Sequence, residues 1–195
     1  MALRNPFTRL VLTARRLARD RRGAGAIEFA ILFPVLIMLY IGAFEITIGL
    51  SVSKRATRAA GTVADLVTQQ QSVTKSTLAQ MPSVATAIFM PYNSTSLTLT
   101  LKITGITIDA SANAKVLWSW AKDGTVPYAK NATVSNVPAD MKTANSFLVR
   151  TELSIPYTMF LFAPNFMPDG MRTITISRSY FYRQRQGDSI PCGDC

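Results

Sequence analysis

The chain has 195 residues, of which 48% are hydrophobic and only 16% charged, whereas an average soluble domain has about 25% charged residues. Its net charge of +10 is unevenly distributed, because residues 1–23 contain seven arginines and one aspartate. This distribution, without zinc-finger spacing or a basic patch interleaved with aromatic residues, argues against nucleic-acid binding. The sequence has no histidine, so the commonest general base and metal ligand is missing.

The first 23 residues form a basic leader. Apolar residues recur in it at helical spacing, with arginines between them: Leu3, Phe7, Leu10, Ala14 and Leu17. This pattern predicts a basic amphipathic helix that can lie on an anionic membrane surface.

A long apolar segment follows the leader. No charged residue occurs from Phe29 to Phe44, and apolar residues continue to Val52. A membrane span needs about 20 residues, so residues 28–50 are predicted to cross the membrane as one helix. The apolar core of a secretory signal peptide is shorter, about 7–15 residues, and precedes a cleavage site of small residues. Here Ser53, Lys54 and Arg55 follow instead, which favours a permanent anchor.

The charges that flank the span predict its orientation. Seven arginines precede it, and only Lys54, Arg55 and Arg58 follow closely. Because the flank richer in basic residues stays in the cytoplasm, the chain beyond residue 50 is predicted to lie outside it.

Two carboxylates and a proline interrupt the apolar character of the span. Glu28 and Glu45 are 17 residues apart, about 25 Å along a helix. If Glu28 lies at the inner interface, Glu45 lies near the outer one, which favours a solvated Glu45 over a carboxylate with a buried partner. Pro34 cannot donate a hydrogen bond to the carbonyl of Ala30, so we expect a kink or local loosening there.

The junction between leader and span carries a recognisable motif. Residues 21–30 read RRGAGAIEFA, and this stretch resembles the processing site of prepilin-like proteins of the tight-adherence (Flp) pilus, where cleavage follows Gly and Glu is the fifth mature residue. The wider segment GAIEFAILFPVLIMLYIGAFEITIG and the following SKRATRAAGTVADLV are similar to the TadE-like family. The firm match covers residues 23–67, and residues 173–185 are loosely similar to a terminal strand of such proteins.

This resemblance implies a bacterial, single-pass inner-membrane pseudopilin that acts in assembly of a tight-adherence (type IVb) pilus. Its processing site would comprise Gly23, Ala24, Glu28 and Phe29, and its partners would be the membrane, a prepilin peptidase and other pilin-like or Tad assembly proteins. Cleavage after Gly23 would create an amine at Ala24, and Glu28 could pair with that amine or with a neighbouring subunit's. Glu28 and Pro34 would thus set helix packing and register. Alternatively, Glu28 only caps the helix and faces lipid headgroups.

Beyond the span, the helix is predicted to continue to about residue 70. Its alanines at 56, 59, 60 and 64 suit either close packing against other helices or docking on the protein's own domain. A break follows at residues 69–72, and apolar spacing predicts a second helix over residues 75–89.

From Leu97 the apolar residues alternate, which predicts strands over residues 97–108 with a bulge at Gly105, and over 115–121. After a long loop to Asn145, strands are predicted over 147–155 and 172–182. These elements predict an α+β fold, in which an antiparallel sheet packs on the long or the second helix. The resemblance implies that the overall architecture is pilin-like. Trp118 and Trp120, on one strand face, suit core packing better than a ligand platform.

The predicted organisation is a leader (1–23), a transmembrane and extended helix (24–70) and an extracytoplasmic domain (71–195) that ends in a flexible tail (186–195). Cys192 and Cys195 in this tail favour a small disulfide ring, with free thiols or half of a metal or redox site as alternatives.

The sequence contains no Ser/His/Asp set, phosphate loop, metal-ligand cluster or convincing carboxylate pair. We therefore expect no enzyme, no catalytic residue, no metal or other cofactor and no small-molecule substrate. The alternative to a pilus-assembly role is a membrane-anchored extracytoplasmic binding module unconnected to pili. Cleavage after Gly23 is expected for the pilus-assembly role and not for the binding module.

Overall fold

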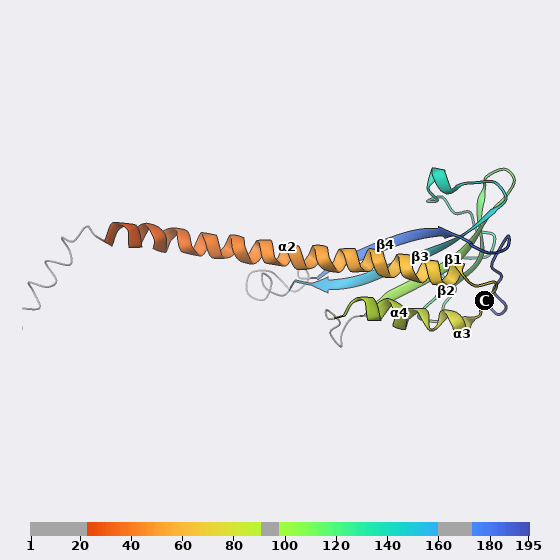
Figure 1. Cartoon of the computed structure of the whole chain (residues 1–195), viewed down its shortest axis with the longest axis horizontal. Helices are drawn as coiled ribbons and strands as arrows, with labels where there is room; N and C mark the ends of the chain where they lie inside the picture. Colours follow the sequence, from red (N-terminus) through yellow and green to blue (C-terminus); the bar gives the residue numbers. More distant parts are fainter. Residues whose placement is uncertain (1–22, 91–97, 160–172) are drawn as a thin grey trace, which may run out of the picture. The chain divides into compact units, whose positions relative to one another are not determined.

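A computed structural model describes residues 23–90, 98–159 and 173–195 (Figure 1). The helices are α2 (Ala24–Thr68), α3 (Lys75–Leu78), α4 (Met81–Ile88) and a short 3₁₀ helix, η2 (Ala139–Met141). The strands are β1 (Thr100–Ile108), β2 (Ala114–Ala121), β3 (Ser146–Thr158) and β4 (Thr173–Arg183). The prediction of an α+β fold, with a long apolar helix followed by a small helix and an antiparallel sheet, is confirmed. The predicted leader helix lies outside the described residues.

The chain divides between Phe44 and Glu45 into two compact units. The described part of the first unit is the N-terminal portion of α2, whose helical assignment continues without interruption through Pro34. The second unit, Glu45–Cys195, contains the remainder of α2 and the whole sheet. We call this second unit the head.

The sheet of the head has the strand order β2-β1-β3-β4, and all neighbours are antiparallel. β3 continues past its predicted end at Ile155 and includes Pro156, which pairs with Thr175 of β4. Pairing between β1 and β3 stops at Ser154, so the last residues of β3 have a strand neighbour on one side only. Proline, which lacks an N–H donor, is compatible with such an edge position.

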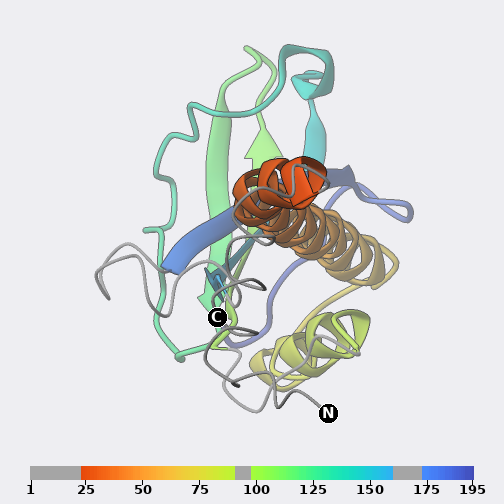
Figure 2. The same ribbon diagram turned by 90° about the vertical axis from the view of Figure 1, so that its left-hand side faces the viewer.

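One face of the sheet packs on helices (Figure 2). Alternate residues of the strands form the main core with one side of α2 and with α3 and α4. The helical contributors include Val52, Ala56, Ala59, Ala60, Val63, Val67, Leu78, Met81 and Ala85. The prediction gave the long helix and the second helix as alternatives, and the sheet packs on both.

The second helix is divided, contrary to the single helix predicted over 75–89. Thr74 caps α3 by accepting a hydrogen bond from the backbone N–H of Thr77. Pro82 lies in the first turn of α4. Proline is well suited to a helix start but interrupts a helix interior, because it has no N–H and crowds the preceding turn. A new helix therefore starts at Met81.

A bulge switches the faces of β2. Gly105 pairs with Trp118 and Ile106 pairs with Val116, so Leu117 is the extra residue. The bulge was predicted at Gly105, and the inserted residue lies opposite it, in the neighbouring strand. Because of this insertion, Trp118 and Trp120 belong to the main core, whereas Ala114 and Val116 belong to a second apolar cluster.

The second cluster lies under the segment that joins β2 to β3. Val134, Val137 and Met141 of this segment pack with Ile106 and Leu148. The same segment covers the outer edge of β2, where Asn131 donates to the carbonyl of Val116 at 2.8 Å and Val134 donates to that of Ala114 at 2.9 Å. The chain itself therefore covers this edge of the sheet at residues 114–116.

Candidate functional site

The predicted processing residues lie at the start of α2. The helix begins at Ala24, directly after Gly23, and a Cβ atom built on Gly23 or Gly25 would meet no atom within 4 Å. Glu28 follows Ala24 by four residues, about one helical turn, and is exposed to solvent. Within the described ranges, no ion pair involves Glu28. Gly23 is therefore exposed, and Glu28 lies about one helical turn after Ala24.

The first two turns continue into an uninterrupted apolar surface. Phe29 and Phe33 are in ring contact, with centroids 5.4 Å apart, and both are exposed. Large apolar side chains are exposed along the rest of this portion, including Ile31, Leu32, Val35, Leu36, Met38, Leu39 and Phe44. In the described part of the chain, α2 is the one helix long and apolar enough to cross a membrane. In a membrane, the lipid hydrocarbon would cover this apolar surface and remove it from water.

Glu45 differs from the prediction of a solvated carboxylate. Glu45 is only 5% exposed, and its Oε1 accepts a hydrogen bond of 2.7 Å from the Tyr157 hydroxyl. The prediction was wrong because it placed Glu45 only along the helix axis, while the head already begins at this residue and β3 reaches it. The alternative of a buried partner is correct. The two residues are 112 positions apart, so no local pattern indicates their contact.

The Glu45–Tyr157 pair ties the start of the head to the end of β3. Burial, together with hydrogen bonding to Glu45 and its negative charge, raises the pKa of the Tyr157 hydroxyl above its usual value. The Tyr157 hydroxyl therefore stays protonated, and able to donate, over the whole neutral range.

We expect Tyr157→Phe to lower the free energy of unfolding of the head by about 1–3 kcal/mol, because it leaves a buried carboxylate without this donor. Since the folded-state pKa of Tyr157 is raised, its contribution is complete below about pH 10, the unfolded-state pKa, and is lost as the pH rises further. Urea unfolding followed by tryptophan fluorescence at pH 7 and above pH 10 measures both effects. Tyr180→Phe is the control, and an equal loss in both variants would contradict the special role of the pair.

The small residues of α2 are used within the head. Ala56, Ala59, Ala60 and Ala64 are all fully buried. Between the two alternatives left open by the sequence, docking on the protein's own domain is the one found. The two tryptophans are likewise core residues, as predicted.

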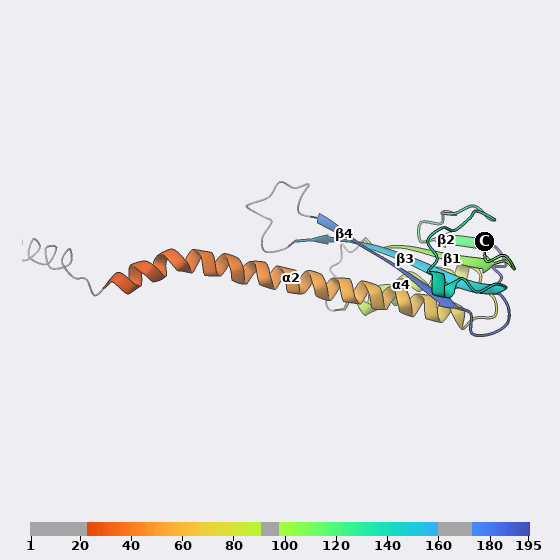
Figure 3. The same cartoon turned by 90° about the horizontal axis from the view of Figure 1, so that it is seen from above.

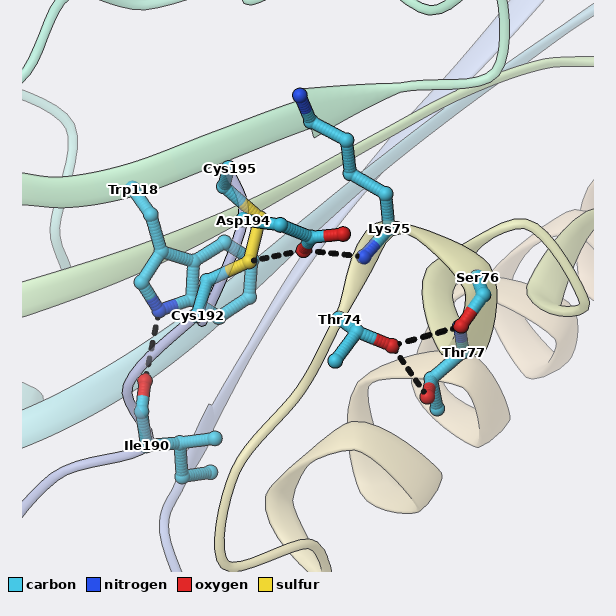
Figure 4. Close-up of a disulfide and its surroundings, with 9 residues drawn as sticks. All are labelled: Thr74, Lys75, Ser76, Thr77, Trp118, Ile190, Cys192, Asp194 and Cys195. Atoms are coloured by element: carbon cyan, nitrogen blue, oxygen red, sulfur yellow. Dashed lines mark hydrogen bonds between the residues drawn. A yellow bond between two sulfur atoms is a disulfide. The ribbon is translucent and has the colours of Figure 1, made fainter.

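The C-terminal tail is docked, which corrects the prediction of a flexible segment over 186–195. Ile190 is fully buried, and its carbonyl accepts a 2.7 Å hydrogen bond from Nε1 of Trp118 (Figure 4). The backbone of Val73 donates to Pro191 and accepts from Gly193. Asp194 accepts a 2.7 Å hydrogen bond from the backbone N–H of Lys75. A single apolar residue, Ile190, among polar ones was the only sequence signal of this docking.

The two cysteines of the tail are joined by a disulfide between Cys192 and Cys195. The Asp194 carboxylate lies within 4.8 Å of both sulfur atoms. Zinc binds cysteine as the thiolate, so the disulfide-bonded sulfurs are not free to act as such ligands. In this state the ring has a structural role, since it closes the segment that holds Asp194 against Lys75.

Residues 23–65 match the family described as TadE-like protein. The match begins at Gly23 and covers α2 almost to its end, so the predicted resemblance is confirmed for the segment that carried it. No curated protein and no solved structure matched the chain. The TadE-like segment and the apolar helix suggest a membrane-anchored protein related to the Tad pilus, with the head as its soluble domain.

Proposed function

We propose that the protein is a single-pass, pseudopilin-like component of tight-adherence pilus assembly, matured by cleavage between Gly23 and Ala24. The observation that carries the proposal is the coincidence of three boundaries. The TadE-like match starts at Gly23, α2 starts at Ala24, and the basic leader ends at the same point. A peptidase that cuts there would remove the leader's net charge of +6 and leave an apolar helix as the new N-terminus.

In this proposal the role of Glu28 is to pair with the amine that cleavage creates. The new amine at Ala24 and the Glu28 carboxylate are one helical turn apart, and a carboxylate near a helix N-terminus is also favoured by the helix dipole. A charge at the hydrocarbon edge is costly without a partner. Pairing with its own amine, or with that of a neighbouring pilin-like helix, satisfies Glu28 and fixes the register between helices.

The proposed location is the bacterial inner membrane, with the N-terminus in the cytoplasm and the head outside. The excess of arginine before the span supports this orientation. An oxidising compartment outside the cytoplasm would also keep the Cys192–Cys195 disulfide formed.

N-terminal sequencing and intact-mass measurement of the full chain, extracted from membranes of cells with an active prepilin peptidase, test the proposal. We expect a mature start at Ala24. Gly23→Val should reduce processing by more than tenfold, because a branched side chain beside the cleaved bond blocks the close approach to the backbone that glycine allows. Gly25→Ala is the matched control: it changes a second exposed glycine two residues away and should leave processing intact.

An intact Met1 in these cells would overturn the proposal and favour an anchored binding module unconnected to pili. If cleavage occurs, the fractions of mature protein in sheared pili and in membranes distinguish a filament subunit from a component of the base. Glu28→Gln should then leave membrane insertion unchanged and reduce cross-linking to other pilin-like helices, because the amide keeps the shape but not the charge.

A further inference from the structure

An open groove runs along the head between the outward side of α2 and β4. It is lined chiefly by Lys54, Arg58, Gly61, Tyr180, Tyr182 and Arg185, and has a volume of about 460 Å³. In two views at right angles, β4 lies alongside the C-terminal portion of α2 (Figures 1 and 3). The hydrogen bond from Arg178 to the Ser53 hydroxyl and the ion pair between Arg185 and Asp65 hold the two elements together at the ends of the groove.

The groove is positively charged. Lys54 and Arg58 are four residues apart on one side of α2, where like charges are mutually destabilising. Across the described ranges, neither residue forms an ion pair. Arg185 is paired with Asp65, so these four side chains leave a net charge of +2.

Their neighbour Arg55 shows the contrast. Its guanidinium donates to the carbonyls of Ile88 at 3.0 Å and Met90 at 2.7 Å, and so holds the end of α4. Of the three basic residues that follow the span, one therefore has a structural role within the head, and the other two face the groove. The positive-inside preference also disfavours cations on this side of the span. Neither an ion pair within the described head nor the orientation of the span therefore explains why Lys54 and Arg58 are basic.

The walls of the groove have the composition of a protein-binding surface. The rings of Tyr180 and Tyr182 are stacked, with centroids 5.6 Å apart. Gly61 lies opposite Tyr180, so no side chain stands between the helix backbone and this ring at that point. Tyrosine and arginine are enriched at protein–protein contacts, where aromatic rings supply contact area at low cost in conformational entropy.

The backbone of β4 adds a second means of recognition. β4 is 11 residues long and is the last strand of the sheet, so one of its hydrogen-bonding sides has no strand neighbour in the described part of the chain. The opposite edge, on β2, is covered by residues 131–134. Exposed edges of this kind accept extended peptides, whose main chain pairs with the strand while alternate side chains reach the adjoining surface.

We propose that the groove between α2 and β4 binds an extended, acidic segment of a partner protein. The segment adds to the outer edge of β4, and the carboxylates of its alternate residues enter the groove, where they meet Lys54 and Arg58 beside the rings of Tyr180 and Tyr182. This surface lies wholly within the head, so the proposal does not depend on cleavage at Gly23.

Two other occupants fit less well. Along α2, Lys54 to Asp65 spans 11 residues, about 16 Å, whereas the headgroup layer on each side of a bilayer is only about 5–8 Å thick. Anionic lipids would thus reach only the near end of the groove. A second copy that paired β4 with β4 would bring Arg178 and Arg183 of both chains onto one edge, and like charges on neighbouring strands are destabilising.

The test uses the full-length protein in neutral detergent micelles and a fluorescein-labelled peptide of about ten alternating valine and glutamate residues, a length that matches β4. Fluorescence anisotropy should show saturable binding that weakens with salt. Lys54→Gln combined with Arg58→Gln should weaken binding by about tenfold. The matched control is Lys130→Gln combined with Lys142→Gln, which removes the same charge from the segment between β2 and β3 and should leave the affinity unchanged.

A second peptide, with the same sequence but alternate backbone nitrogens methylated, tests edge pairing and should bind at least tenfold more weakly. Equal binding by the wild type and the groove variant, equal binding of a valine–lysine peptide, or no saturable binding would overturn the proposal. So would phosphatidylglycerol vesicles that bind in place of the peptide with the same dependence on Lys54 and Arg58, because this result would assign the groove to lipid. A dimer that forms only in the wild type would assign it to a second copy.

Discussion

Gly105→Ala is expected to destabilise the head by about 2 kcal/mol, within the range of about 1–3 kcal/mol typical of overpacked cores. A Cβ atom at position 105 would lie 2.5 Å from Cε2 and Nε1 of Trp118 and 2.9 Å from Cζ of Phe147. Both distances are far below van der Waals contact. The added methyl group can be accommodated only if a large buried ring moves.

Neither ring has freedom to do so. Trp118 is buried, and its Nε1 is held by the carbonyl of Ile190 at 2.7 Å. Phe147 is fully buried in the main core. A shift of Trp118 would break its hydrogen bond to Ile190, which is one of the contacts that hold the C-terminal tail, so the substitution should loosen the tail as well as the sheet.

Urea unfolding of the full-length protein in detergent measures this effect. Both tryptophans of the chain lie in the core of the head, so fluorescence reports on the head alone. Gly193→Ala is the control, since its Cβ would meet no atom within 4 Å. Superimposable unfolding curves for Gly105→Ala and the wild type would show that the ring of Trp118 does not lie against Gly105.

The sequence predicts those parts of the fold that depend on local patterns. The apolar run identifies α2, and alternation of apolar residues identifies the four strands to within a few residues of their ends. The break after α2 is also foreseen, because Gln69, Gln70 and Gln71 interrupt the helical pattern. In each case the signal lies within the element itself.

Contacts between distant residues escape this reasoning. Distance along the helix predicts a solvated Glu45, but its environment is set by Tyr157 at the far end of a strand. The docking of the tail depends on Ile190 entering a core built by other elements. Leu117 shows a subtler limit: one inserted residue reverses the faces of β2, and strand alternation alone does not indicate on which strand a bulge occurs.

The proposed site divides in the same way. The motif around Gly23 and Glu28 is local and can be found from sequence, whereas the groove joins α2 to β4 across more than a hundred residues. The alanines of α2 were open to two interpretations because a stripe of small residues suits both a partner helix and a sheet. Their burial in the head leaves the portion of α2 before Glu45 as its exposed apolar surface.

Ala60→Leu tests this division of α2. Ala60 is fully buried where α2 meets the sheet, so a leucine side chain would have to push the helix from the strands. We expect a loss of about 3 kcal/mol in the free energy of unfolding of the head, the upper end of the overpacking range.

The adjacent substitution Gly61→Ala should act in the opposite direction. Its Cβ would lie 3.9 Å from the ring of Tyr180, an ordinary contact, and alanine is favoured over glycine inside a helix by about 0.8–1 kcal/mol. Urea unfolding followed by tryptophan fluorescence should therefore give shifts of opposite sign at two neighbouring positions. Opposite shifts at these two positions require that Ala60 lie on the docked side of α2 and Gly61 on an open side. An unchanged unfolding midpoint for Ala60→Leu would contradict docking and leave the small-residue face of α2 free to pack against other helices.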